Sequence, residues 1–183
     1  MRPMLPTVTR EDLELLTRFD ATSIPEAEWS HACHLRIAYL ALCVQPYPQA
    51  VRRLRDGIRR LDRAHGIPEG DERGYHETLA LAWLRLVAAA LDSGTPGADS
   101  RSFLAMHPEL GREDRVLEHY SPDRVRTARA RREFVLPDRA PLPALRPPTV
   151  GNRSDPRKDR VADLDDPAPR AHGHILKASR RTP

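Results

Sequence analysis

Proline placement divides this 183-residue chain into a part that can form long helices and a part that cannot. Nine of its 18 prolines fall between Pro137 and Pro183, whereas most of the others stand where a helix can begin or where a loop is expected. Proline inside a helix removes a backbone hydrogen bond and clashes with the preceding turn. Helices are therefore expected only before residue 135.

Apolar residues recur at helical spacing in that first part of the chain. In segment 48–66 they recur every three or four positions, with arginine and aspartate between them, which predicts an amphipathic outer helix. Segment 25–44 is apolar on nearly all sides and is expected to be the central helix. Further helices are predicted at 10–18, 74–91, 100–105, 112–120 and 122–134. The fold predicted for residues 1–145 is all-α, a single helical bundle of about five to seven helices.

The remaining residues, 146–183, form a Pro/Arg-rich C-terminal tail with few large apolar side chains, and we expect this tail to be disordered. Residues 1–145 contain 21 arginines, no lysine and 21 acidic residues, so the net charge of +4 belongs entirely to the tail. A folded nucleic-acid-binding domain carries its basic excess on the folded surface. We therefore expect no specific nucleic-acid partner.

The two cysteines, Cys33 and Cys43, lie ten positions apart in one predicted helix. That separation is about 15 Å, which is beyond disulfide reach, and free thiols are typical of a reducing compartment. The sequence shows no apolar stretch long enough to span a membrane and no N-terminal segment of the signal-peptide type. A cytoplasmic, non-membrane protein is expected.

Three histidines are the strongest functional candidates. His31 and His34 are three positions apart on the central helix, so they share a face at about 5–6 Å between Cβ atoms. His76 opens the predicted helix 74–91 and is expected on its apolar side. Three neutral imidazoles on two facing helices predict a site for a divalent transition metal, zinc or iron. The alternative is a structural histidine cluster whose rings are satisfied by hydrogen bonds in the core.

Three further residues are candidates for catalysis: Glu28, Glu77 and Tyr75. Glu28 stands three positions before His31, and Glu77 follows His76, so each carboxylate is a candidate fourth ligand, partner of a ligand or general base. The alternative for each is a first-turn acid that interacts with the helix dipole. Tyr75, like Tyr120, is expected near the pocket. Because no second Glu-x-x-His pair occurs, a dinuclear site of the ferritin type is not expected.

Four sequence blocks, EWSHACHL, GYHETLALAW, HYSPDRV and AR…FVLPDRAPLP, follow one another in this order. They resemble a family of small helical proteins without an assigned reaction, which has the pattern E-W-S/T-H-x-x-H-L, then Y-H-E-T, then Y-S, then A-R, and ends on P-D-x-x-P-L-P. The match covers about residues 12–143 and leaves the tail outside. The resemblance implies the domain limits and the site residues, but no mechanism.

The function expected from these patterns is that of a metal-dependent enzyme acting on a small-molecule substrate through a three-histidine site. The alternative is a non-catalytic binding or regulatory helical module, in which the histidines hold the bundle together or sense a ligand. An open metal position beside a pocket would favour the enzyme, whereas a closed site would favour the structural alternative.

Overall fold

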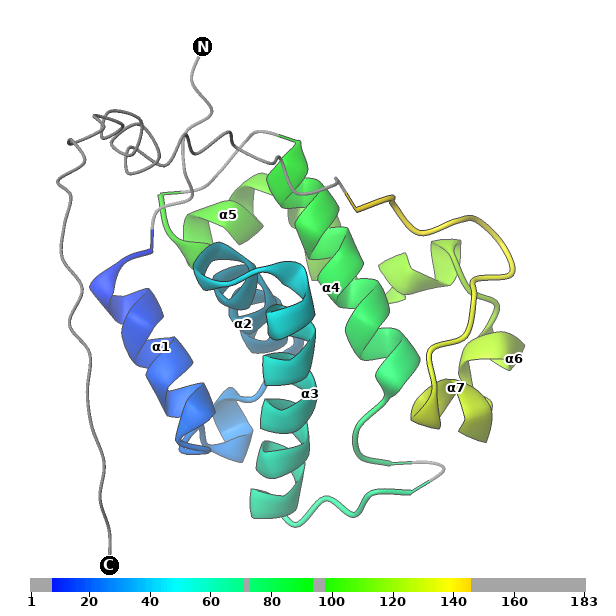
Figure 1. The fold of residues 1–183 in the computed structure, drawn as a ribbon, viewed down its shortest axis with the longest axis horizontal. Coiled ribbons are helices and arrows are strands. Elements are labelled where there is room, and N and C mark those ends of the chain that lie inside the picture. The colour runs from blue at the N-terminus through cyan, green and yellow to red at the C-terminus, as the bar shows by residue number, and fades with distance from the viewer. Residues whose placement is uncertain (1–7, 71–72, 94–97, 146–183) are drawn as a thin grey trace, which may run out of the picture. The chain divides into compact units, whose positions relative to one another are not determined.

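A computed structural model describes residues 8–70, 73–93 and 98–145 (Figure 1). Within these ranges the regular structure is helical throughout, so the expected all-α class is confirmed. The expected disordered tail lies outside the described residues. The α-helices are α1 (Arg10–Asp20), α2 (His31–Val44), α3 (Tyr47–Ala64), α4 (Glu77–Asp92), α5 (Ser100–Met106), α6 (Pro122–Val125) and α7 (Ala128–Arg132), and 3-10 helices cover Glu26–Glu28, Pro108–Gly111 and Glu113–Glu118.

Helix α2 is the centre of the bundle, as its apolar sequence predicts. It packs against α1, α3, α4 and α5 (Figure 1). Its buried residues point in all directions around the helix axis: Cys33, Leu35, Ile37, Ala38, Tyr39, Leu40 and Ala41. Neither Cys33 nor Cys43 forms a disulfide, as expected.

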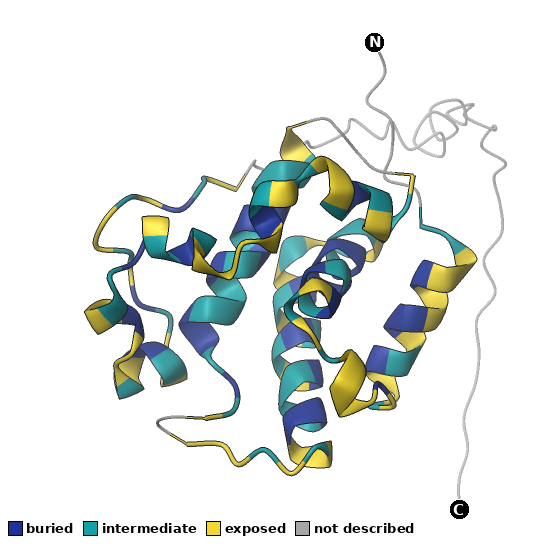
Figure 2. Ribbon diagram, turned by 180° about the vertical axis from the view of Figure 1, so that it is seen from behind, coloured by how far each residue is buried: buried dark blue, intermediate teal, exposed yellow. Residues whose placement is uncertain are grey.

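The outer helices α1 and α3 bury one face each, and buried and exposed residues alternate along both (Figure 2). They approach closely where the ring of Phe19 lies over Gly57. A Cβ added to Gly57 would lie 2.1 Å from Cζ of Phe19, so only glycine fits at this position. Helix α1 begins with a capping box, in which Thr9 and Asp12 exchange hydrogen bonds with each other's backbone N–H.

The starts of α2 and α4 differ from the sequence prediction. Helix α2 begins at His31 rather than near Pro25, because the Ser30 side chain accepts a hydrogen bond from the backbone N–H of Cys33 and caps the helix there. Helix α4 begins at Glu77 rather than near residue 74, and His76 itself is its N-cap. These two shifts place His31 in a first turn and His76 outside a helix.

Helix α5 lies where a helix was expected at 100–105, and the segment after it forms shorter elements than expected. The helix predicted at 112–120 is the 3-10 helix Glu113–Glu118, and the one predicted from residue 122 is divided into α6 and α7, because Thr127 caps a new helix by accepting from the N–H of Ala130. A small second core joins this segment to α4, with buried Ala82, Val116, Tyr120, Val125, Ala130, Val135 and Leu142. Among the helices of the described ranges, none is long and apolar enough to cross a membrane.

Candidate functional site

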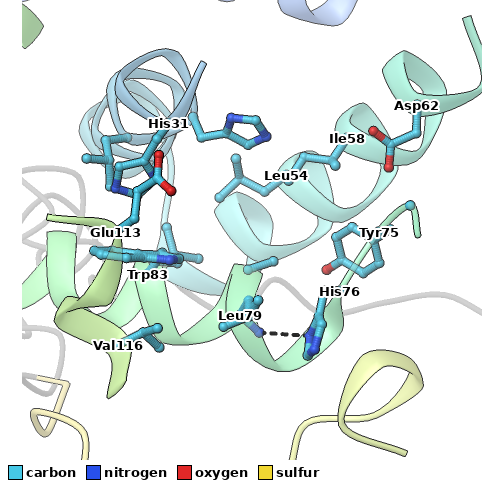
Figure 3. A pocket seen from close by; sticks show the side chains of 16 residues that line it. His31, Leu54, Ile58, Asp62, Tyr75, His76, Leu79, Trp83, Glu113 and Val116 are labelled. Carbon is cyan, nitrogen blue, oxygen red and sulfur yellow. Dashed lines mark hydrogen bonds between the residues drawn. The ribbon is translucent and has the colours of Figure 1, made fainter. Parts of the chain in front are cut away.

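A cavity of about 420 Å³ lies between α2, α3, α4 and the 3-10 helix Glu113–Glu118 (Figure 3). All three candidate histidines line it, together with Asp62, Tyr75 and Glu113. Most of the remaining wall is apolar: Leu35, Ala38, Leu54, Ile58, Leu79, Ala80, Trp83, Leu84 and Val116. The volume and the mainly apolar wall with a few polar groups are those of a small-molecule pocket.

His31 stands in the first turn of α2 with one ring nitrogen committed to the backbone. Its Nε2 lies 3.0 Å from the carbonyl oxygen of Leu110, and its ring packs edge-on against Trp83 with 4.5 Å between centroids. A carbonyl oxygen only accepts hydrogen bonds, so Nε2 carries the hydrogen of the neutral ring. The lone pair of the His31 ring therefore lies on Nδ1.

His34 has the opposite tautomer. Its Nδ1 donates to the carbonyl oxygen of Ser30 at 2.8 Å, one helical turn back, and this leaves the lone pair on Nε2. The ring packs against the indole of Trp29 with 3.7 Å between centroids. The pKa of His34 is lowered to about 4, mainly by burial and in smaller part by the neighbouring His31, although the hydrogen bond to Ser30 opposes this shift. His34 is a neutral hydrogen-bond acceptor at physiological pH.

His76 uses both ring nitrogens within the protein. Its Nδ1 accepts from the backbone N–H of Leu79 at 3.2 Å and thereby caps α4, while Nε2 donates to the carbonyl oxygen of Val125 at 2.9 Å. Burial lowers the pKa of His76, so the ring is neutral. His76 therefore lies at the cavity wall with no lone pair left for a ligand, whereas the sequence placed it on the apolar face of a helix.

The three histidines meet at one cavity, but not around one point. His31 and Trp83 lie at one end of the cavity, and His76 and Tyr75 lie at the other (Figure 3). In the part of the chain that the structure describes, no group of three or more His, Cys, Asp or Glu residues could hold a metal ion. The zinc or iron site stays a prediction.

Glu77 and Tyr75 form a buried cluster with Arg55. Arg55 of α3 binds the Glu77 carboxylate through Nε, at 2.9 Å, and through Nη2, and the Tyr75 hydroxyl donates to the same carboxylate at 3.0 Å. Burial raises the pKa of Tyr75, and the charge of Glu77 raises it further. The Glu77 carboxylate is thus occupied by protein donors, and Tyr75 contributes its ring to the cavity wall.

The other two candidates lie away from the cavity. Glu28 is exposed in the 3-10 helix Glu26–Glu28 and pairs with Arg18 at 2.9 Å. Since the chain turns at Trp29 before α2 begins, Glu28 does not share a helical face with His31. Tyr120 is fully buried in the second core, where its hydroxyl donates to the carbonyl oxygen of Val135 at 3.0 Å. Neither lines the cavity.

Two lining carboxylates, Asp62 and Glu113, are absent from the sequence-based prediction of the site. The sequence-based prediction assigns all charged residues of segment 48–66 to the solvent-facing side of the helix, and Asp62 among them. Its spacing of four from Ile58 and of eight from Leu54, both of which line the cavity, is the signal that places it on the apolar side. Glu113 reaches the cavity from a distant 3-10 helix, for which the local sequence gives no sign.

Comparison with known proteins gives no match: no family model, curated protein or solved structure is similar to this chain. The likeness between its sequence blocks and a family of small helical proteins stays an interpretation. The feature of this chain that points to a function is the cavity with its three histidines.

Proposed function

We propose that this chain is a binding domain for a small, mainly apolar molecule, with the cavity between α2, α3 and α4 as its site. The observation that carries the proposal is the convergence of His31, His34 and His76 on one apolar cavity of about 420 Å³. Binding pockets combine an apolar wall with a few polar groups that fix the orientation of the ligand. The two free cysteines support a location in a reducing compartment, and we propose that the protein binds its ligand in the cytoplasm.

His34 is the residue that would orient such a ligand. Its Nε2 carries a lone pair in a half-buried position, and its other nitrogen is held by Ser30, so the ring direction is fixed. A neutral imidazole accepts a hydrogen bond from a hydroxyl or amine of the ligand without the cost of burying a charge. A weakly basic ring of this kind is better suited to binding than to proton abstraction near neutral pH.

The experiment is to fill the cavity and measure binding of an uncharged fluorescent probe, N-phenylnaphthylamine. Ala80 lines the cavity from α4, so Ala80→Phe would place a ring inside it. The matched control is Ala105→Phe, at an exposed position on α5. We expect the parent and Ala105→Phe to bind the probe with similar affinity, and Ala80→Phe to bind at least about tenfold more weakly. Equal binding by all three proteins, or none by the parent, would contradict the proposal.

A metal-dependent enzyme is the second candidate, and the tautomers of His31 and His34 favour it. Each ring donates its N–H to a backbone carbonyl and keeps one lone pair, as metal-bound imidazoles do. His31 Nδ1 and His34 Nε2 would be the two protein ligands of the ion, and Glu113 lies at the same end of the cavity as His31 (Figure 3). A bound divalent metal supplies a Lewis acid and lowers the pKa of its water.

Elemental analysis of untagged protein tests this candidate. If zinc or iron is present, His31→Ala and His34→Ala should each remove most of it, and chelator should lower the melting temperature of the parent. His76→Ala separates two arrangements: retained metal indicates a site built on α2, and lost metal indicates the three-histidine site expected from the sequence. Metal-free protein whose melting temperature ignores added zinc and iron would contradict both.

A further inference from the structure

The wall of the cavity carries two carboxylates and three histidines, and neither arginine nor lysine is among its lining residues. Two carboxylates, Asp62 and Glu113, line it, whereas none of its 16 lining residues is arginine or lysine, in a chain with 30 such residues. The low pKa values of His34 and His76 keep those rings uncharged at neutral pH. Two carboxylates with no arginine or lysine among the lining residues favour a cation over an anion as the ligand of this cavity.

Asp62 is the deepest of these groups. The residue is 5% exposed, and the described residues offer its carboxyl group no hydrogen bond or ion pair. Burial raises the pKa of Asp62, and the charge of Glu69 raises it further, although His65 opposes this. A carboxylate held largely away from bulk solvent without a cation beside it is destabilised, so a ligand that brings a positive charge would stabilise it.

Nearby arginines do not provide that partner. Arg59, one turn before Asp62 on α3, lies over the ring of Tyr75 with its guanidinium carbon 4.6 Å from the centroid, and it pairs with Glu69 at 3.7 Å. Arg55 is bound to Glu77. Both guanidinium groups are paired with a carboxylate other than Asp62, and neither residue lines the cavity.

We propose that the cavity takes a protonated amine with an apolar body, whose ammonium group pairs with Asp62. The inference rests on the proposed function, because it names the ligand class of the same site. Asp62 lies at the end of the cavity near Tyr75, and His31 and Trp83 lie at the other end, with Leu54 and Leu79 between them (Figure 3). An elongated ligand would place its ammonium at Asp62 and its apolar body along this middle section toward Trp83.

The test is a matched pair of ligands that differ in charge and little in shape, phenylpropylamine and phenylpropanol, each used to displace N-phenylnaphthylamine. We expect the parent to bind the amine at least about tenfold more tightly than the alcohol. Asp62→Asn should abolish this preference and Asp62→Glu should retain part of it. Asp56→Asn is the matched control, because Asp56 is exposed on the same helix.

The outcomes separate this inference from the proposed function. If probe and alcohol bind but the amine is not preferred, the inference is wrong and the binding site stands. If the preference is lost in Glu113→Gln and kept in Asp62→Asn, the assignment to Asp62 is wrong. If no probe binds the parent, the proposed function itself fails. Should Asp62→Asn not fold, the parent's preference and its retention in Asp62→Glu still decide the matter.

Discussion

At the scale of single residues, backbone carbonyls determine what the histidines can do. The carbonyl oxygens of Leu110 and Ser30 each accept from one nitrogen of His31 and His34, so these two rings keep one lone pair each. His76 has its second nitrogen bound to the N–H of Leu79 as well. Three residues of one type that line one cavity are thus chemically different, which residue spacing alone does not reveal.

The low pKa of His34 predicts a pH dependence of stability. The ordinary pKa of 6.5 applies to the unfolded chain, and the folded value is about 4, so between these pH values the unfolded state binds more protons than the folded state. The free energy of unfolding should therefore fall as the pH is lowered from about 6.5 to about 4, by about 2 to 3 kcal/mol from this residue. Below about pH 4 the ring is protonated in both states, so the stability that the neutral ring provides at neutral pH is lost.

Urea unfolding of the parent and of His34→Gln between pH 4 and pH 7 measures this effect. The stability difference between the two proteins should change across that range by about the same 2 to 3 kcal/mol. A direct NMR titration of the His34 ring serves as the independent check. A midpoint near 6.5 would show that the ring is freely hydrated and would contradict its neutral role in the cavity.

At the scale of elements, the sequence predicts which segments are helical, but not always where they begin. Apolar spacing identifies α1 to α5, because those helices bury a continuous stripe or are buried all round. Pro25 and Ser30 are both acceptable starts for α2, and only the hydrogen bond from Cys33 to Ser30 decides between them. Histidine is not among the preferred capping residues, so the start of α4 at His76 was not predictable from propensity.

His76 joins two elements, and its removal should destabilise the fold more than the loss of a cap alone. It caps α4 through Leu79 and holds the end of α6 through Val125. His76→Ala should lower the free energy of unfolding by about 2 kcal/mol, whereas His76→Asn, which can still cap, should lower it by about 1 kcal/mol. Chemical denaturation measures both.

Asp99→Ala is the control for this comparison. Asp99 caps α5 by accepting from the backbone N–H of Ser102 at 2.7 Å. The loss of this cap should cost about 1 kcal/mol, as is typical of an N-cap residue. If His76→Ala costs no more than Asp99→Ala, the link between α4 and α6 contributes nothing to stability.

At the scale of the whole molecule, the site depends on contacts between distant segments, and this limits what the sequence alone predicts. The histidines and Tyr75 were recognisable because they sit in or beside apolar helices. Asp62 comes from the outer helix α3 and Glu113 from a 3-10 helix about fifty residues later. Their meeting is a consequence of how the helices pack, which no local pattern encodes. The charge of the cavity, and hence the proposed ligand class, follows from the tertiary structure.

The same tertiary packing predicts where the chain can be shortened. Residues 135–145 run outside the helices, yet Val135 and Leu142 are buried in the second core, and Thr78 of α4 binds both the carbonyl oxygen of Glu133 and the N–H of Val135. A chain ending at residue 134 loses about 3 to 6 kcal/mol of apolar burial, which corresponds to a melting temperature lower by roughly 10 °C or more.

A chain ending at residue 145 should melt within a few degrees of the full chain, because residues 146–183 have few apolar side chains to bury. Thermal unfolding of the three chains side by side decides this. A large loss in the chain ending at 145 would show that the C-terminal residues pack on the domain, and a small loss in the chain ending at 134 would show that the second core is not needed for stability.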